Sequence, residues 1–266
     1  MVRLNTAKGE GLPPIGPLAA LQFLTRVPIR LRSAPDMAGM VIWFPLAGAV
    51  IGLSVGGVGA GLWHLVPPLV AAAVAVTIGL LVTGAFHEDG LGDIADAFGG
   101  GHTVERRLEI MKDSRHGTYG VAAMCASIVV RIVSLGSLPG PAALFASAVA
   151  AHVMARTVAV CLMAAAPLAT HRGLGADYGQ STTVRRATVT AAMGVGLTAL
   201  VVGWWVLPLA LAAVAAAAAV GVLAMRKIGG ISGDVLGATE QVAECLCLVV
   251  CTGLAARYGV WWAASP

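Results

Sequence analysis

Residues 142–166 read AALFASAVAAHVMARTVAVCLMAAA, a run in which His152 and Arg156 are the only acidic or basic side chains. A helix needs about 20 apolar residues to cross the hydrocarbon of a bilayer, so this run predicts a membrane-spanning helix. The rest of the chain is of the same kind, since 58% of its 266 residues are hydrophobic and only 11% are charged. The mean hydropathy of +0.86 lies far above that of water-soluble domains. We therefore predict an integral membrane protein.

Other apolar stretches are long enough for the same interpretation. Together they predict an all-α, polytopic bundle of about seven transmembrane helices within one membrane domain, residues 1–266. The candidate spans are 41–63, 65–86, 119–138, 142–166, 187–206, 208–225 and 236–255. Prolines at or near several junctions favour tight turns, because a residue without a backbone donor is tolerated where a helix ends or begins.

The first 40 residues contain an apolar stretch that we do not expect to span. It reads GLPPIGPLAALQFLTRVPIRL over residues 11–31, and four prolines interrupt it. Arg26, Arg30 and Arg32 occupy its end, where arginines bind lipid headgroup phosphates. Residues 1–40 are therefore predicted to be a cytoplasmic or interfacial segment that contacts membrane lipid.

The basic residues outside the predicted spans are unevenly distributed. They lie before residue 40, within 87–118 and 167–186, and at Arg226 and Lys227, whereas the intervening connections contain none. Because positive residues are retained on the cytoplasmic side, the N-terminus and these loops are predicted to be cytoplasmic. The formal net charge of +4 is too small to indicate a nucleic-acid partner.

The stretch FHEDGLGDIADA at residues 86–97 is unusually acidic for this chain. Asp89, Asp93 and Asp96 are spaced i, i+4 and i+7, so a helix would place them within about 60 degrees of one another. Three like charges on one face repel, and burial would raise their pKa values. A divalent cation removes both costs. Carboxylate ligands suit Mg²⁺ or Mn²⁺, and Mg²⁺ often binds substrate phosphate as well.

Basic residues that could bind a phosphate come soon after the acidic stretch in the sequence. The stretch RRLEIMKDSRHGTYG at 106–120 contains several cationic side chains, and arginine forks match phosphate oxygens. These are Arg106, Arg107, Lys112 and Arg115. Residues 87–118 are therefore predicted to form a cytoplasmic catalytic loop. The alternative, a solvated loop of mixed charge, does not explain three evenly spaced aspartates at the end of a span. The role of His87 is not decided by the sequence: it is either a histidine at the membrane interface or a catalytic residue.

A second polar motif, RKIGGISGDVLGATEQVAE, occupies residues 226–244. It combines glycine pairs with Asp234, followed by Glu240 and Glu244 one turn apart on the next predicted span. Acids inside a span are costly unless they find a partner in the bundle, and Arg156 lies at a similar depth in its own span. Arg156 and Glu244 could therefore pair, either as a structural ion pair or as part of a substrate site.

These motifs together resemble the cobalamin synthase, or adenosylcobinamide-GDP ribazoletransferase, family. The resemblance rests on GAFHEDGLGDIADAFGGG, RLEIMKDSRHGTYG and GGISGDVLGATEQVAE, preceded by LQFLTRVPI and WFPLAGAVIG, and it runs from about residue 20 to 250. The family pattern is roughly F-H-x-D-G-x-x-D-x-x-D, followed by I-M-[KR]-D-S-R-x-G-T-x-G. The chain departs from it at Glu88, where an apolar residue is common, at Ala97, where Gly is frequent, and at Ser232, where Thr is usual.

The resemblance implies a reaction and its participants. A hydroxyl of α-ribazole, or of its 5′-phosphate, attacks the cobinamide-linked phosphate of adenosylcobinamide-GDP, and GMP leaves. The implied cofactor is Mg²⁺, and the implied location is the bacterial cytoplasmic membrane with the site on the cytoplasmic side. The implied metal ligands are Asp89, Asp93, Asp96 and Asp113, with His87 or an aspartate as the base. The implied substrate contacts are Arg26, Arg106, Arg107, Lys112, Ser114, Arg115, Asp234, Glu240 and Glu244.

Two other classes were weighed. A CDP-alcohol phosphotransferase or aromatic prenyltransferase also uses aspartates at a membrane surface, but the DGLGD stretch at 89–93 lacks the Ala-Arg pair of the CDP-alcohol motif. A transporter would need polar access from both sides, and the external connections are almost free of charge. The sequence leaves open the oligomeric state and association with other late cobalamin enzymes.

Overall fold

The computed structural model describes residues 15–169, 182–260 and 262 of the chain. Over these residues the fold is built of helices, and the single β feature is an isolated bridge between Leu168 and Ile231. The helices are α1 (Gly16–Leu24), α2 (Met37–Met40), η1 (Val41–Trp43), α3 (Phe44–Leu62), α4 (Pro68–Thr83), α5 (Phe86–Gly100), α6 (Val104–Ile110), α7 (Thr118–Gly136), α8 (Pro141–Ala165), α10 (Val184–Val202), η2 (Gly203–Trp205), α11 (Val206–Ile228) and α12 (Gly233–Ala255). The predicted all-α membrane bundle is confirmed.

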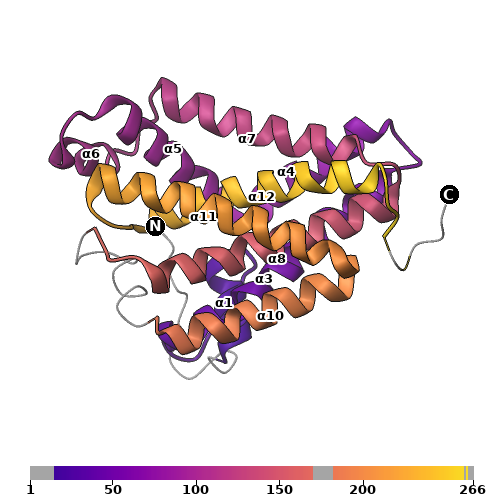
Figure 1. Cartoon of the computed structure of the whole chain (residues 1–266), viewed down its shortest axis with the longest axis horizontal. Coiled ribbons are helices and arrows are strands. Elements are labelled where there is room, and N and C mark those ends of the chain that lie inside the picture. Colours follow the sequence, from indigo (N-terminus) through magenta and orange to yellow (C-terminus); the bar gives the residue numbers. More distant parts are fainter. Residues whose placement is uncertain (1–14, 170–181, 261, 263–266) are drawn as a thin grey trace.

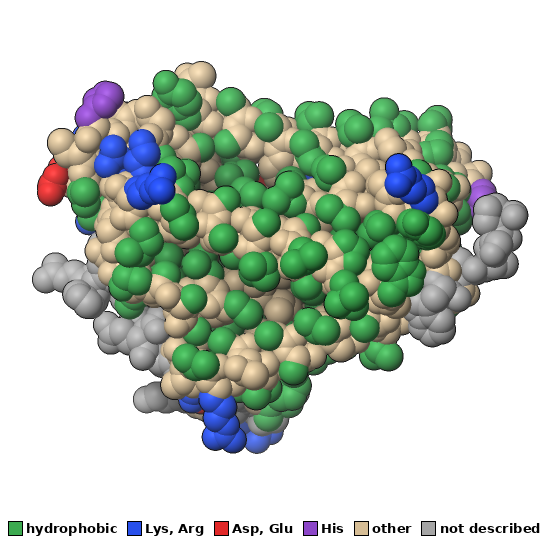
Figure 2. Space-filling view, in the orientation of Figure 1, with side chains coloured by type: hydrophobic (Ala, Val, Ile, Leu, Met, Phe, Trp, Pro, Cys, Tyr) green, Lys and Arg blue, Asp and Glu red, His purple; other side chains and the backbone are tan. Residues whose placement is uncertain are grey.

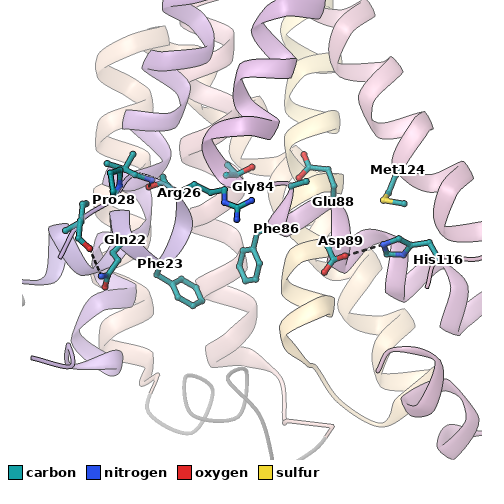
Figure 3. A pocket seen from close by; sticks show the side chains of 15 residues that line it. Gln22, Phe23, Arg26, Pro28, Gly84, Phe86, Glu88, Asp89, His116 and Met124 are labelled. Carbon is teal, nitrogen blue, oxygen red and sulfur yellow. Dashed lines mark hydrogen bonds and ion pairs between the residues drawn. The ribbon is translucent and has the colours of Figure 1, made fainter. Parts of the chain in front are cut away.

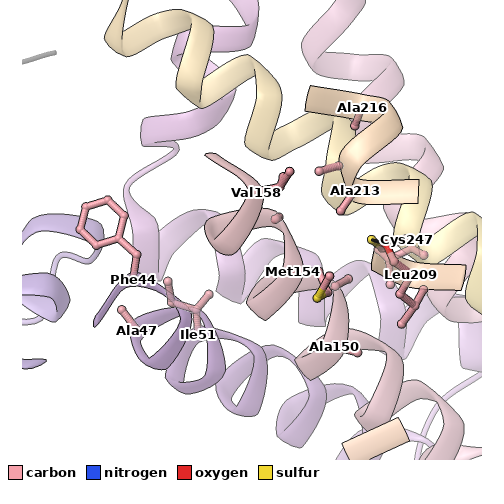
Figure 4. Close-up of a cluster of buried hydrophobic side chains, with 14 of the residues drawn as sticks. Phe44, Ala47, Ile51, Ala150, Met154, Val158, Leu209, Ala213, Ala216 and Cys247 are labelled. Carbon is pink, nitrogen blue, oxygen red and sulfur yellow. Dashed lines mark hydrogen bonds between the residues drawn. The ribbon is translucent and has the colours of Figure 1, made fainter. Parts of the chain in front are cut away.

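Helix α8 forms the centre of this bundle. It packs against α3, α10, α11 and α12, and it is buried along almost its whole length. Gly52 of α3 meets the α8 backbone so closely that an added Cβ would lie 2.6 Å from the Cα of Val149. Such small residues let two helices approach in a membrane, where packing replaces the hydrophobic effect between helices. Figure 4 shows the resulting core, in which side chains of α3, α8 and α11 meet.

The long apolar helices of the structure correspond to the predicted spans, and their number depends on where one stretch is divided from the next. Five helical stretches in the described part of the chain are long and apolar enough to cross, or up to six if the bent pair α4–α5 counts as one span. They are Ala38–Leu62, Thr118–Gly136, Pro141–Ala165, Val184–Ile228 and Gly233–Ala255. The stretch Val184–Ile228 contains both predicted spans 187–206 and 208–225, as helices α10 and α11 joined by η2. In Figure 1 the chain reverses direction between them, at η2.

The bend between α4 and α5 decides where the acidic stretch lies. Helix α4 has only 16 residues, and Gly84 and Ala85 follow it with left-handed φ angles of 67° and 55°. The axis turns by 89° there, and α5 runs across the end of the bundle. The predicted catalytic loop 87–118 is therefore mostly helical, because α5 and α6 fill it. Figure 1 shows both helices at the end where α7 and α12 begin.

The N-terminal segment packs into the bundle as far as the structure describes it. Helix α1 has nine residues, too few to cross a bilayer, and Ala19 and Ala20 on it are fully buried. Residues 1–14 of the predicted segment 1–40 lie outside the described residues. Figure 2 shows hydrophobic side chains spread over most of the visible face, with charged groups confined to its edges. This distribution is typical of a protein surrounded by lipid.

Candidate functional site

The two faces of α5 differ sharply in their surroundings. His87, Glu88, Gly90 and Ile94 are buried, whereas the side chain of Asp89 is 65% exposed. Gly90 lets the buried face press against α12, since an added Cβ would lie 3.0 Å from the carbonyl oxygen of Asp234. The exposed face of α5 opens to the largest cavity described below.

This cavity has a volume of about 570 Å³ and lies between α5, the segment after α1, and the chain that leads into α7. Its lining includes Phe23, Arg26, Glu88, Asp89 and His116. Figure 3 shows Asp89 and His116 on one side and Arg26 on the other, with the ring of Phe86 between them and the ring of Phe23 on the Arg26 side. The cavity therefore offers acidic, basic and aromatic groups to one ligand.

Asp89, Asp93 and His116 form the candidate metal site. One ligand atom from each lies within 4.8 Å of the others. His116 Nε2 is 3.3 Å from Asp89 Oδ1, and His116 Nδ1 is 3.7 Å from Asp93 Oδ1. Burial and the neighbouring Asp89 carboxylate raise the pKa of Asp93 to about 7, so the cluster carries negative charge that the protein does not offset. These donors fit a divalent cation.

His116 is the residue that the sequence analysis missed. It lies between Arg115 and Gly117, at the variable position of the block that ends in GTYG. Its distance from Asp89 along the chain gave no reason to place them together. The only available signal was a histidine among the cations that follow the acidic stretch. An imidazole ligand would widen the range of suitable metals from Mg²⁺ towards Mn²⁺ and other transition metals.

Asp96, a predicted metal ligand, lies outside this cluster. Its Oδ2 accepts a hydrogen bond of 2.6 Å from the backbone N–H of Gly117, and its Oδ1 one of 2.8 Å from Gly120. Both N–H groups belong to the unpaired first turn of α7, so the buried carboxylate caps that helix. By this geometry Asp96 positions the segment that carries His116 rather than binding a cation.

Asp113, the other predicted ligand, also lies outside the cluster. Its carboxylate accepts bonds from the Arg115 side chain at 2.9 and 2.7 Å and from the Arg115 backbone N–H at 3.1 Å. Hydrogen bonding from Arg115 lowers the pKa of Asp113 to about 2. The neighbouring Lys112 and Ser114 are exposed. An exposed ion pair of this kind contributes little to stability.

The predicted phosphate contacts divide between the cavity and the outer surface. Arg26 lines the cavity, and its backbone N–H donates to Val82 O at 2.7 Å. Arg106 forms an exposed ion pair with Glu109. Arg107 donates instead to the carbonyl oxygens of Gly101 and Lys227, at 3.0 and 2.8 Å, and so ties α6 to the end of α11. Only Arg26 of these three lines the cavity.

A second set of charges is buried inside the bundle, and we call it the buried network. Its members are Glu88, Arg131, His152, Arg156, Glu240 and Glu244. Glu244 Oε2 lies 3.0 Å from both His152 Nδ1 and Arg156 Nη1. Arg156 also contacts Glu240. The pairing of Arg156 with Glu244 suggested by their depths is confirmed.

Helix α5 joins this network through Glu88. Arg131 of α7 lies 2.8 Å from Glu88 Oε1 and 3.4 Å from Glu244 Oε1, so it bridges α5 and α12. His87 takes part as well, since its Nδ1 is 3.3 Å from Glu240 Oε2. The predicted site residues His87, Glu240 and Glu244 are thus brought together, but away from the Asp89 cluster. Asp234 lies beside the Asp89 cluster, since its backbone meets Gly90 and its carboxylate is an electrostatic neighbour of Asp89 and Asp93.

The chain is similar to a family and to individual proteins. The family described as cobalamin-5-phosphate synthase matches residues 16–252. A protein of Azorhizobium caulinodans is 40% identical over 249 residues, which are 85% of this chain and 90% of the relative. One of Chlorobaculum tepidum is 35% identical over 261 residues, 94% of this chain and 99% of the relative. Both relatives are named adenosylcobinamide-GDP ribazoletransferase. No solved structure matches the chain.

Proposed function

Because this chain belongs to the cobalamin-5-phosphate synthase family, it is a transferase of the late nucleotide-loop assembly step of coenzyme B12 synthesis, and we propose that its reaction takes place in the cavity beside Asp89 and His116. A hydroxyl of α-ribazole, or of its 5′-phosphate, attacks the cobinamide-linked phosphorus of adenosylcobinamide-GDP. A P–O bond forms to that hydroxyl oxygen, and the diphosphate P–O bond breaks. GMP leaves with the electron pair, and the hydroxyl proton passes to a base.

One observation carries this proposal. Two carboxylates and an imidazole converge at the edge of a cavity of about 570 Å³, a size typical of small-molecule sites. The protein supplies no arginine or lysine ion pair to Asp89 or Asp93 within the described residues. A diphosphate substrate with its divalent cation would supply that missing positive charge.

We propose Mg²⁺ as the cation, held by Asp89, Asp93 and His116. When bound, the ion neutralises negative charge that develops on the departing phosphate. The imidazole makes Mn²⁺ a second candidate, and a comparison of the two ions in the assay below distinguishes them. Asp96 holds the start of α7, and through it His116, at the distance that the site requires.

Arg26 is the proposed phosphate contact within the cavity, opposite the acidic cluster. Arg115 is a second one, because its pair with Asp113 is exposed and a phosphate can compete for it. The proton acceptor is proposed to be a cavity carboxylate rather than His87. Asp89 lines the cavity and has no arginine or lysine partner among the described residues, whereas Glu88 pairs with Arg131 and His87 faces Glu240.

The proposed location is the bacterial cytoplasmic membrane, with the cavity open to the cytoplasm. The apolar helices make the chain a multi-pass membrane protein. The end of the bundle that holds α5 and α6 also carries Arg106, Arg107 and, at the end of α11, Lys227. Positive residues favour the cytoplasmic side.

The decisive experiment measures GMP release. Purified protein in detergent, with MgCl₂, adenosylcobinamide-GDP and α-ribazole, should release one GMP for each cobalamin formed. EDTA should stop the reaction, and excess Mg²⁺ or Mn²⁺ should restore it. Absence of GMP with intact, monodisperse protein would reject the proposed function.

A further inference from the structure

A second pocket lies directly behind the cavity wall. It holds about 80 Å³, and by the same measure one water molecule needs about 10–15 Å³, so it has room for several waters or a planar ring system. Phe44, Ala159, Met163 and Leu236 are among its apolar lining residues. Ala159 and Leu236 belong to α8 and α12, so this pocket lies between membrane-crossing helices.

Two aromatic residues separate this pocket from the cavity. Phe23 and Phe86 line both, and their ring centroids lie 5.6 Å apart in an edge-to-face arrangement. Phe23 also stacks on Phe44, with centroids 5.8 Å apart and planes inclined by 14°. A ligand could therefore place a polar group in the cavity and a flat apolar group against these rings. Aromatic walls of this kind favour planar π systems.

The floor of the pocket is polar. His87, Arg156 and Glu240 line it, and Arg156 is only 2% exposed. The guanidinium contacts Glu240 and Glu244 through Nη1, whereas its Nε–H has no hydrogen-bond acceptor among the described residues. An unmatched buried donor is costly, and a ligand that brings an acceptor removes that cost. A purely hydrocarbon ligand would leave the donor unmatched.

We propose that this pocket binds the base of the acceptor nucleoside, a planar fused heteroaromatic ring whose ring nitrogen accepts a hydrogen bond from Arg156. The ribose then lies at the Phe23–Phe86 wall, and its hydroxyl reaches the phosphate in the cavity. This assignment rests on the proposed function. It also gives a reason for a membrane-embedded enzyme, because the helices that cross the bilayer form the base pocket.

The first test fills the pocket. Ala159→Leu should raise KM for α-ribazole by about tenfold, since overpacking costs roughly 1–3 kcal/mol. KM for adenosylcobinamide-GDP should change less than about twofold. Ala165→Leu, at the exposed end of the same helix, is the matched control and should change neither value. An unchanged KM for α-ribazole in folded Ala159→Leu protein, or equal increases for both substrates, would overturn the pocket assignment.

The second test needs no turnover. The probes are 1-methylbenzimidazole, which has one acceptor ring nitrogen, and 1-methylindole, which has the same shape without it. Wild-type protein should prefer the first, and Arg156→Lys, which keeps the positive charge but removes Nε–H, should reduce that preference by about tenfold. An identical preference in both proteins would refute the assignment. If the wild type releases no GMP but shows the Arg156-dependent preference, the proposed function fails while the base pocket stands.

Discussion

Glu88 and Asp89 are neighbours on α5, yet they belong to two groups of acidic residues that differ in whether arginines pair with them. In the buried network, Glu88 and the acids of α12 face Arg131 and Arg156 from other helices. At the edge of the cavity, Asp89 and Asp93 both lie close to His116. The protein neutralises the first set itself and leaves the second for a ligand. We infer that the ion pairs between helices hold the bundle together, and that the carboxylates without an arginine or lysine partner belong to the proposed reaction site.

The largest expected effect concerns the buried network. Glu244→Gln leaves Arg131, His152 and Arg156 without their shared carboxylate, and breaking a buried ion pair costs about 3–5 kcal/mol. The thermal unfolding midpoint in detergent should fall by about 10 °C. Glu105→Gln, an exposed position on α6, should lower it by less than about 1 °C. Equal midpoints for the two variants would contradict the assigned role of the network.

The next effect belongs to the cavity and concerns activity rather than stability. Asp89→Asn and Asp93→Asn should each lower kcat by about 10²–10³-fold, because a metal ligand that stabilises developing charge is lost. The unfolding midpoint should stay within about 2 °C of wild type, since neither side chain pairs with an arginine or lysine and both approach only the partly exposed His116. Glu105→Gln again serves as the control for loss of one negative charge. Near-normal kcat in either variant, measured by GMP release, would remove the metal assignment.

Asp96 tests the boundary between the two groups of acidic residues. Asp96→Ala leaves two backbone N–H groups at the start of α7 without an acceptor and should cost about 2 kcal/mol of stability. At saturating Mg²⁺ the folded variant should keep kcat within about tenfold, because Asp96 is not a ligand in this geometry. Thermal unfolding and an Mg²⁺ titration of GMP release measure the two effects. Full loss of kcat with unchanged stability would restore Asp96 to the metal site.

The smallest effect is a dependence of stability on pH without divalent cation. Between about pH 4 and 7 the folded state binds the Asp93 proton more tightly than the unfolded state, because the pKa of Asp93 is raised from 3.8 to about 7. Stability should therefore fall by a small amount as pH rises from 5 to 8, and Mg²⁺ should restore it at pH 8.

Two variants separate the groups responsible. Asp93→Asn should flatten this part of the profile. Asp113→Asn should not, because the pKa of Asp113 is lowered to about 2 and its contribution changes only below about pH 4. Unfolding midpoints measured from pH 5 to 8 in EDTA check both expectations, and an unchanged slope in Asp93→Asn would count against the raised pKa.

Part of the site was predictable from spacing alone. Asp89 and Asp93 fall on one face of α5 as their i, i+4 spacing predicted, and Arg156 meets Glu244 because both lie at similar depths in their helices. Asp96 has the right spacing too, but its carboxylate instead accepts hydrogen bonds from backbone N–H groups at the start of α7. The hydrogen bonds between Asp96 and the start of α7 also bring His116 to the cluster, and its position there could not be read from the spacing of residues in the sequence.

The helical membrane bundle was predictable from hydropathy alone, because a helix satisfies its own backbone hydrogen bonds and can therefore cross the bilayer core as an apolar segment. The sequence also predicts that the acidic helix binds a divalent cation. The sequence could not show which acids pair with arginines and which do not. That pairing depends on the bend after α4 and on where α7, α8 and α12 bring their side chains. The sequence gives the sign of each side-chain charge, whereas the ion pairs that these charges form depend on the distances between helices.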